Sequence, residues 1–151
     1  MPDTGDELRA AFENATVARL ATIDSDDRPN VVPICFVVRE ASLYSAVDHK
    51  PKRSRKLKRL VNIATHPAVS VIVDHYADDW TQLWWMVAEG RAEIVSDAAE
   101  ATLAVDLLRA KYAQYRAAPP AGAVVALRID RWHGWSAALG TTIRIEEPAE
   151  R

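Results

Sequence analysis

The sequence predicts an α+β fold, mainly β, in which a small antiparallel barrel of about six strands carries its helices on the outside. Two observations predict it. Apolar, β-branched runs are joined by short polar connections that are typical of hairpins, and only three segments have the apolar spacing of a helix. The 151 residues suffice for one hydrophobic core, and no change of composition marks a linker. We therefore expect a single domain over residues 1–151.

The first half of the chain reads as one helix followed by three strands. The spacing of Leu8, Ala11 and Phe12 predicts a short helix over residues 6–14. Three runs of strand-like composition follow, each bounded by turn formers: 16–23, 30–39 and 42–47. Because the connections are short, the economical arrangement of these strands is an antiparallel meander.

The second half continues with two helices and three strands. Ser54 is the expected cap of a helix whose apolar stripe is formed by Leu57, Leu60, Val61 and Ala64. Strands are expected at 68–75 and 83–95, with Gly90 as a candidate bulge. A helix capped at 96–97 runs to about 117, and a last strand spans 123–136. The Glu-rich end is expected to fray from about residue 146.

Composition and charge exclude several classes of protein. The formal net charge is -2, whereas a dedicated nucleic-acid-binding domain is normally basic. No apolar run approaches the roughly 20 residues that a membrane-spanning helix needs, and the first seven residues are acidic, unlike a signal peptide. We expect a cytoplasmic protein that binds neither membranes nor nucleic acid.

Most of the familiar sequence motifs of metal, nucleotide and catalytic sites are missing. The four histidines lack the spacing of zinc ligands, so no metal site is expected. None of the five glycines belongs to a nucleotide-binding Gly-rich loop, and no serine sits in a nucleophile elbow. The single cysteine, Cys35, lies in an apolar strand pattern, which favours an inert buried thiol over a reactive one.

A dense basic run is the strongest functional signal. Seven of the ten residues from 50 to 59 are cationic, and they are Lys50, Lys52, Arg53, Arg55, Lys56, Lys58 and Arg59. At the start of a helix, such charges add to the exposed N–H groups and the positive end of the helix dipole, which suits phosphate. The alternative is a solvated helix face, but that face usually interleaves acidic partners, which are missing here.

Five tryptophans form the second signal, in two short segments. Trp84 and Trp85 are adjacent in a predicted strand and therefore point to opposite faces, so one fills the core while the other lines a pocket or a subunit contact. Trp132 and Trp135 divide in the same way.

From about residue 11 to 137 the chain resembles the split-barrel flavin and deazaflavin oxidoreductases related to pyridoxamine 5'-phosphate oxidase. The resemblance is carried by five segments in order: 18–24 (ARLATID), 28–34 (RPNVVPI), 43–47 (LYSAV), 58–63 (KRLVNI) and 66–70 (HPAVS). Three further segments are similar to a mainly actinobacterial branch regarded as users of coenzyme F420, an 8-hydroxy-5-deazaflavin: 74–76 (DHY), 79–80 (DW) and 83–85 (LWW).

The resemblance implies a homodimer with the cofactor in grooves between the subunits. Coenzyme F420 is the expected cofactor, and FMN is the alternative. The matching positions place Val32, Pro33, Ile34 and Cys35 along the ring, Ser45 and Ala46 beside it, and Lys58 and Arg59 on the phosphate. Trp85 matches a ring-flanking position, and Trp132 matches one supplied by the other subunit. The polyanionic tail of F420 gives the remaining cations a ligand: Lys50, Lys52, Arg53, Arg55 and Lys56.

The function that this implies is hydride transfer from the reduced deazaflavin to an unsaturated small-molecule acceptor. The protein then has to hold and shield the ring and orient the acceptor. Tyr44, Tyr76, His75 or solvent are the candidate proton donors, although His75 fits a structural place at a strand end better. Rival interpretations are an FMN-dependent reductase or oxidase of the same fold, a carrier that stores a cofactor without turnover, and a module whose basic helix binds nucleic acid.

Overall fold

The computed structural model describes residues 1–47 and 53–148, and of residues 53–57 the backbone alone. The helices are α1 (Gly5–Asn14), α2 (Arg53–Thr65), the short 3-10 helix η1 (Trp80–Gln82), α3 (Ala98–Lys111) and α4 (Ala113–Ala117). The strands are β1 (Ala18–Ile23), β2 (Pro29–Ile34), β3 (Val37–Arg39), β4 (Ser42–Ala46), β5 (Ala68–His75), β6 (Trp84–Ile94), β7 (Val124–Ser136) and β8 (Thr142–Glu146).

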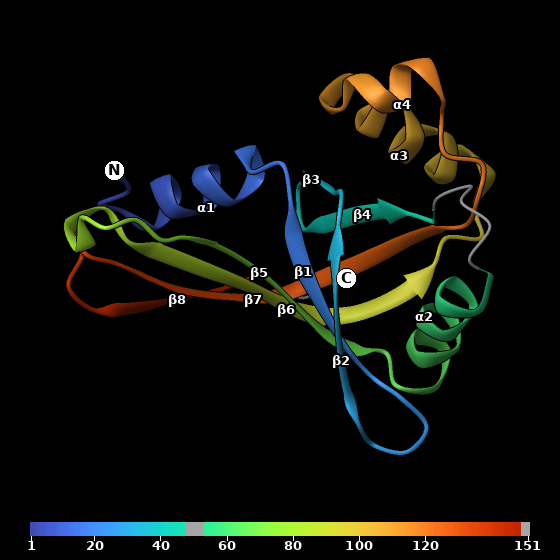
Figure 1. Ribbon diagram of the computed structural model, residues 1–151, viewed down its shortest axis with the longest axis horizontal. Coiled ribbons are helices and arrows are strands. Elements are labelled where there is room, and N and C mark those ends of the chain that lie inside the picture. Colours follow the sequence, from blue (N-terminus) through green and yellow to red (C-terminus); the bar gives the residue numbers. More distant parts are fainter. Residues whose placement is uncertain (48–52, 149–151) are drawn as a thin grey trace.

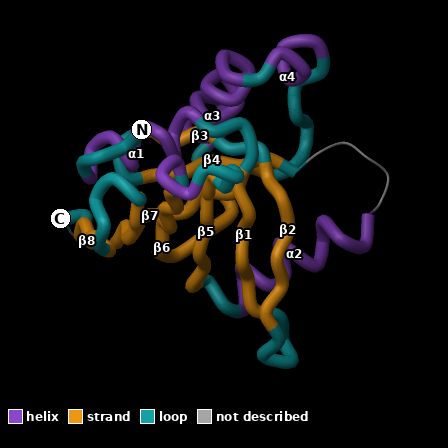
Figure 2. Tube along the Cα trace, turned by 60° about the vertical axis from the view of Figure 1, so that its left-hand side comes forward, coloured by secondary structure: helices purple, strands orange, loops and turns teal. Residues whose placement is uncertain are grey.

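The sheet curls because its two edge strands follow each other in the chain. Its order is β2-β1-β5-β6-β7-β4-β3, with β8 paired to the second half of β7, and every pairing is antiparallel. Only Cys35 and Phe36 join β2 to β3. The three Cα–Cα steps from Ile34 to Val37 span at most about 11 Å, so the two edges must approach each other. The sheet therefore closes into a barrel in which β2 and β3 act as one broken strand, as Figures 1 and 2 show.

Helices α1 and α2 pack against the main core of the curled sheet. Leu8 and Phe12 of α1 and Ile63 of α2 are almost completely buried in the main core, against β1, β5, β6 and β7. Helices α3 and α4 lie on the other side of the β4 hairpin, where Tyr44 and Ala46 meet them in two smaller clusters. The face that β2, β1, β5, β6 and β7 turn away from the core carries no helix among the described residues.

A β-bulge in β7 changes which residues of that strand point inward. Glu89 pairs with Arg131 while Gly90 pairs with Ile129, so Asp130 is an extra residue. Before the bulge the odd positions up to Ile129 enter the main core, and after it the even position Trp132 does. A bulge at Gly90 was expected from the sequence and is confirmed, with the inserted residue on the neighbouring strand.

The expected barrel with outer helices is confirmed, but four details differ. The strand expected at 30–39 breaks at Cys35, because the chain leaves one sheet edge there and joins the other. Both hairpins of the expected meander are present, β1 with β2 and β3 with β4, but they lie at opposite edges of the sheet, and β4 also pairs with β7. The helix from 98 to 117 breaks at Tyr112, whose side chain binds the backbone of Phe36. β8 extends to Glu146 and Glu147 is hydrogen-bonded, while residues 149–151 of the end that was expected to fray lie outside the described residues.

The apolar stripe of α2 is also shifted from the expected one. Val61 is 56% exposed and Ala64 is exposed, whereas Ile63 is 2% exposed and Leu60 packs against the core. Asn62 is buried as well and donates to the Thr22 hydroxyl at 3.4 Å. The helix thus presents a partly polar face to β1, which the apolar count alone does not reveal. None of the described helices is long and apolar enough to cross a membrane.

Gly90 is predicted to be indispensable for the bulge. A Cβ at this position would lie 1.9 Å from the Arg128 carbonyl oxygen, a backbone atom that cannot move aside cheaply. We expect Gly90→Ala to lower the free energy of unfolding by about 3 kcal/mol, measured by urea denaturation. Gly5→Ala is the control, because its Cβ would meet only the ends of the Ile143 and Ile145 side chains. Equal stability of the two variants would contradict the prediction.

Candidate functional site

The strand expected to hold a cofactor ring lies at one edge of the sheet with one exposed flank. Ile34 is 5% exposed and Val32 packs against the core, so these two side chains face inward. Pro33 and Cys35 are exposed. The expectation of a buried thiol is therefore wrong, because Cys35 belongs to the link that leaves β2 and not to a core strand. Of the four residues, Pro33 and Cys35 offer surface to a flat ring.

Ser45 and Ala46 lie across the split from this flank. Their side chains are buried, and Ala46 packs against Leu108 and Tyr115. The ladder between β3 and β4 ends at the pair Val37 and Tyr44, so no β3 residue stands opposite these two positions. They therefore border the opening between β2 and β4, and they offer a ligand backbone groups and little side-chain surface.

The basic helix α2 contacts the β1–β2 turn. Lys50 and Lys52 lie outside the described residues, and Arg53 and Arg55 are described only as backbone in the first turn of α2. The side chain of Lys58 is 57% exposed, and its Nζ lies 3.8 Å from Asp24 Oδ2. Arg59 is half-buried. The described part of the run thus combines one exposed lysine with one partly packed arginine.

Asp24 orders the turn beside Lys58. Its Oδ1 accepts hydrogen bonds from the backbone N–H of Asp26 at 2.9 Å and of Arg28 at 3.0 Å. The bond from Arg28, followed by those from Asp26 and Asn30, keeps the pKa of Asp24 below its ordinary value despite its burial. The carboxylate therefore stays charged next to Lys58 and fixes the β1–β2 turn against α2.

Two residues that the sequence did not single out hold the link after β2. Lys111 Nζ donates to the carbonyl oxygens of Phe36 at 2.9 Å and Glu13 at 3.0 Å, and it lies 3.8 Å from the centre of the Phe36 ring. Burial lowers the pKa of Lys111 to about 8. The Tyr112 hydroxyl accepts the Phe36 N–H at 3.0 Å. The end of α3 therefore fixes the backbone where the exposed flank of β2 stops.

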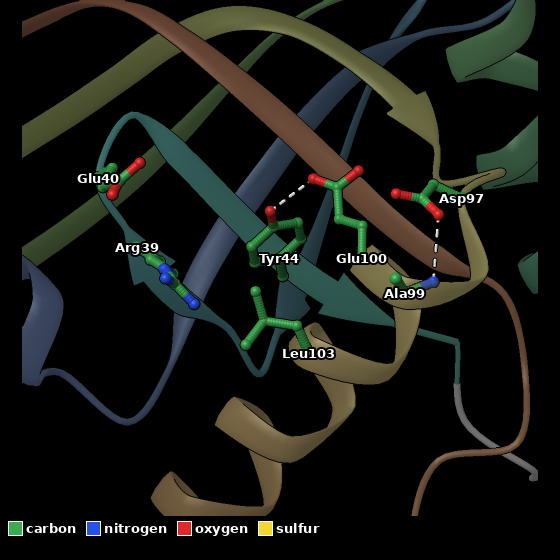
Figure 3. Close-up of a pocket in the computed structure, with 7 residues that line it drawn as sticks. All are labelled: Arg39, Glu40, Tyr44, Asp97, Ala99, Glu100 and Leu103. Atoms are coloured by element: carbon green, nitrogen blue, oxygen red, sulfur yellow. Dashed lines mark hydrogen bonds between the residues drawn. The ribbon is translucent and has the colours of Figure 1, made fainter.

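Tyr44 belongs to a separate hollow beside α3, of about 390 Å³, which Figure 3 shows. Its hydroxyl donates to Glu100 Oε2 at 2.6 Å, and Arg128 binds the same carboxylate with two nitrogens at 2.6 and 2.9 Å. Arg128, followed by Tyr44, lowers the pKa of Glu100 to about 2. Burial and then Glu100 raise the pKa of Tyr44. Tyr44 therefore points toward α3 and not toward the flank of β2.

Trp132 is a core residue. It is 0% exposed and meets Phe12 edge to face at 5.0 Å. Its Nε1 donates to Glu147 at 2.9 Å, and the Arg9 guanidinium lies 4.9 Å from its ring centre. A ring-flanking role for Trp132 is therefore wrong for this chain, because the bulge turns it inward. The partner tryptophan of this segment, Trp135, is half-buried on the outer face.

On the outer face of β6 and β7, residues that are far apart in the sequence lie next to one another. Trp85 pairs with Trp135 in the ladder, while Trp84 packs against the core, so the expected placement of Trp84 and Trp85 on opposite faces is confirmed. The ring of Trp85 meets His133 edge to face at 5.6 Å. His75 stacks on Trp84 at the strand end, and the neighbouring Tyr76 is 68% exposed.

A charged cluster follows Trp85 along this face. Glu89 Oε1 lies 3.1 Å from His133 Nδ1, and its other oxygen accepts a hydrogen bond from Arg131 Nη2. The hydrogen bond to Glu89 raises the pKa of Arg131. A hollow of about 460 Å³ lies beside Glu89 and Arg131 and reaches across β5 and β1 to Pro29. No group of metal-ligating side chains occurs within the described residues.

Glu100 is predicted to make stability depend on acid. A carboxylate whose folded pKa is about 2 and whose ordinary value is 4.5 stabilises the fold above pH 4.5 and loses this contribution as the pH falls toward 2. We expect the free energy of unfolding, measured by urea denaturation from pH 5 to 2, to fall less steeply in Glu100→Gln than in the wild type. Tyr44→Phe removes one of the three hydrogen bonds to Glu100 and is expected to give an intermediate slope. Identical slopes for all three proteins would contradict this.

The two tryptophans of β7 are predicted to respond differently to the same change. Trp132→Phe removes the buried Nε1–H that donates a hydrogen bond to Glu147, and it leaves a small cavity. We therefore expect this substitution to lower the free energy of unfolding by about 2 kcal/mol. Trp135→Phe, on the half-buried outer face, should cost clearly less. Thermal unfolding of both variants measures the difference, and a larger loss in Trp135→Phe would show that our assignment of faces is wrong.

Comparison with solved structures shows the fold. A heme binding protein from Mycobacterium smegmatis superposes with a TM-score of 0.74 and 17% identity, over 97% of this chain and 59% of its own, so the chain spans about three fifths of that protein. A conserved hypothetical protein from Mycobacterium tuberculosis gives 0.73 and 19%, over 91% and 88%. A FAD-binding protein from Mesorhizobium loti gives 0.65 and 22%, over 87% and 93%.

The family itself is shown by the sequence. No curated protein matches the chain. A family model described as pyridoxamine 5'-phosphate oxidase matches residues 4–136, which is most of the chain. The split barrel expected from the resemblance is thereby confirmed. With its curled antiparallel sheet and its broken edge strand, this chain belongs to the pyridoxamine 5'-phosphate oxidase family.

Proposed function

We propose that the protein is an oxidoreductase that binds coenzyme F420 between two copies of the chain and transfers hydride to an unsaturated small-molecule acceptor. One observation carries the proposal: β2 exposes Pro33 and Cys35 on one flank, and α2, which begins in a run of cations, contacts the turn of the same β1–β2 hairpin through Lys58 and Asp24. An exposed strand flank for a flat ring and a basic helix for phosphate therefore adjoin one hairpin.

The described residues fit such a ligand. The opening between β2 and β4 is bordered by Cys35 on one side and by Ser45 on the other. Lys58 is exposed, and Asp24 holds it at the β1–β2 turn. Lys50, Lys52, Arg53 and Arg55 precede it in the chain and give the polyanionic tail its cations. A single phosphate, as in FMN, would leave most of these charges without a ligand.

The homodimer is part of the proposal. The outer face of the sheet is not covered by a helix of the described chain, and it carries Val31 at 65% and Ile72 at 36% exposure. A second copy would cover these side chains and shield the ring from water. Trp85 and Trp135 lie on this face and take the ring-flanking place that Trp132 does not.

When bound in its reduced form, the coenzyme supplies the hydride. The chain itself contributes positioning: the flank of β2 orients the ring, Lys111 and Tyr112 fix the backbone where that flank ends, and the basic helix binds the phosphate and the tail. Tyr44 is directed at Glu100 and away from β2, so it does not serve as the proton donor of this groove.

The second candidate function is an FMN-dependent reaction in the same groove. The observation that favours it is the family, together with a structural neighbour from Mesorhizobium loti described as FAD-binding. The two cofactors share a flat ring and a phosphate and differ in the charge of the tail, so the cations outside the phosphate site distinguish them.

Titration of the purified protein with both cofactors tests the proposal, and a charge variant sharpens it. We expect Lys50, Lys52 and Arg53, changed together to Gln, to weaken F420 binding about 10-fold or more, since each exposed ion pair contributes about 0.2–1 kcal/mol. Binding of FMN should change much less.

The control removes two exposed cations from other elements, Arg39 of β3 and Arg144 of β8, and should leave both affinities near the wild-type values. Equal losses for the two cofactors would count against the assignment of these residues to the tail. Micromolar binding of FMN without binding of F420 would refute the deazaflavin proposal itself.

A further inference from the structure

We propose that the protein has a second ligand site, between the end of α2 and the end of β6, and that this site binds a small carboxylate with an apolar body. A hollow of about 600 Å³ lies there, and its apolar lining consists of Ile63, Ala64, Pro67, Ala92 and Ile94. Charged residues border it as well. None of its lining residues belongs to the groove proposed above for the coenzyme, so the inference does not rest on that function.

The hollow exists because β6 is longer than its neighbour β5. The ladder between the two strands begins at the pair Ala68 and Arg91, whereas β6 continues to Ile94. Pro67 fills only the first position beyond the ladder, where its carbonyl oxygen accepts the Ala92 N–H at 2.7 Å. The end of α2 borders the remaining gap, and Figure 1 shows the end of β6 beside this helix. A missing strand position therefore creates the hollow.

The free edge of β6 offers little to an extended peptide. The Val95 N–H donates to the Val124 carbonyl oxygen at 2.9 Å, and hydrogen-bonded pairs alternate with non-hydrogen-bonded pairs in an antiparallel ladder. The N–H and C=O of Ile94 therefore point away from β7, into the gap. Because Pro67 already binds the Ala92 N–H, only Ile94 offers both groups to an added strand. A small molecule that fills the hollow is the better match.

The lining favours an apolar body. Ile63 and Ala92 are 2% and 5% exposed and belong to the main core, so they form the floor of the hollow. Ile94 is 43% exposed, and Ala64 is exposed as well. A ligand that covers these side chains removes apolar surface from water, which favours binding. The volume lies within the range of about 300–1,000 Å³ that is usual for small-molecule pockets.

Arg91 is the reason to expect a negative charge on the ligand. It stands directly opposite Arg128 in the ladder between β6 and β7, where like charges repel each other. Arg128 is neutralised by Glu93 at 2.7 Å and by Glu100 at 2.6 Å. Arg91 is exposed, and none of the described carboxylates pairs with it. Of the three charged residues that line the hollow, Arg91 is thus the one without a described partner.

A carboxylate matches this arrangement better than a phosphate does. One guanidinium binds the two oxygens of a carboxylate through two parallel hydrogen bonds. A phosphate carries up to two charges and is typically bound where a helix begins. Here the hollow lies at the other end of a helix, because Ile63 and Ala64 are next to Thr65, the last residue of α2. The negative end of the helix dipole disfavours a doubly charged group there.

The length of α2 separates this site from the cations proposed to bind the coenzyme. Ile63 follows Arg55 by eight residues, which corresponds to about 12 Å along the helix axis. The cations are concentrated in the first half of α2, whereas the hollow adjoins its last turn. A ligand in the hollow and a coenzyme on the basic run can therefore be bound at the same time.

Three probes with the same apolar body test the preference for a negative charge. Naphthylacetate is anionic at neutral pH, naphthylethanol is neutral and naphthylethylamine is cationic, and titration calorimetry measures the Kd of each. We expect the acid to bind about 10-fold more tightly than the alcohol, because a charge-assisted hydrogen bond is stronger than a neutral one, and the amine to bind most weakly. Equal affinities of acid and alcohol would overturn the inference. So would no binding of the acid at millimolar concentration.

Two variants locate the bound probe. Arg91→Gln removes the cation and should lower the affinity for the acid about 10-fold, to that for the alcohol, with the affinity for the alcohol unchanged. Because Arg91 also borders the hollow beside Glu89 and Arg131, a second variant is needed. Ala64 is exposed and lines the hollow at α2 but not the other one, so Ala64→Trp should abolish the binding of both ligands.

Arg144→Gln is the control. It removes an exposed cation from β8, far from α2 in the sheet order, and should bind both ligands as the wild type does. An unchanged affinity for the acid in Arg91→Gln would overturn the role of that cation. Binding that Ala64→Trp leaves intact would show that the probe lies elsewhere.

Methyl NMR of the wild-type protein gives a test that needs no variant. The acid should shift the methyl signals of Ile63 and Ile94 and leave those of Ile23 and Ile143, which lie on other strands, unchanged. Shifts at Ile23 without a shift at Ile94 would place the probe in the hollow on the outer face and overturn the inference. Displacement of the acid by F420 or FMN would show that the hollow belongs to the coenzyme site, and would overturn it too.

Discussion

The two-residue link between β2 and β3 is the constraint from which the architecture follows. Because Cys35 and Phe36 must join opposite edges of one sheet, the sheet has to curl, and the barrel remains split where the link crosses. The split leaves one flank of β2 exposed, and the ladder between β3 and β4 ends there at Tyr44. Lys111 and Tyr112 stabilise this geometry through the backbone of Phe36. The candidate groove is therefore a result of barrel closure and not of an added loop.

The bulge at Asp130 determines the chemistry of the outer face. One inserted residue reverses the alternation of β7, so a tryptophan enters the core and an arginine and a histidine leave it. Gly90 permits this because no side chain fits next to the Arg128 carbonyl. Bulges are frequent near active sites since they redirect single side chains in this way. Here the redirected side chains meet one carboxylate, Glu89.

Charge is distributed unevenly over the molecule, and each group has a different physical role. Glu100 and Arg128 form a tight hydrogen-bonded pair beside α3, which ties β7 to that helix. Glu89 and its partners lie on an uncovered face, where a second copy would desolvate them further. Lys58 lies in α2 after Arg53 and Arg55, next to the turn that one buried aspartate, Asp24, orients.

The sequence by itself determined the local features. Turn chemistry and apolar period predicted β5 at its observed bounds, the bulge at Gly90 and the division of Trp84 from Trp85, because these depend on neighbours along the chain. Only the tertiary structure decided which strands meet, that Cys35 is exposed, that Trp132 is buried and that Glu89 joins His133. These facts depend on barrel closure and on one inserted residue in a partner strand. Alternation with a period of two shows that a strand has two different faces. Which face is buried depends on the strands that pair with it, and these can be distant in the sequence.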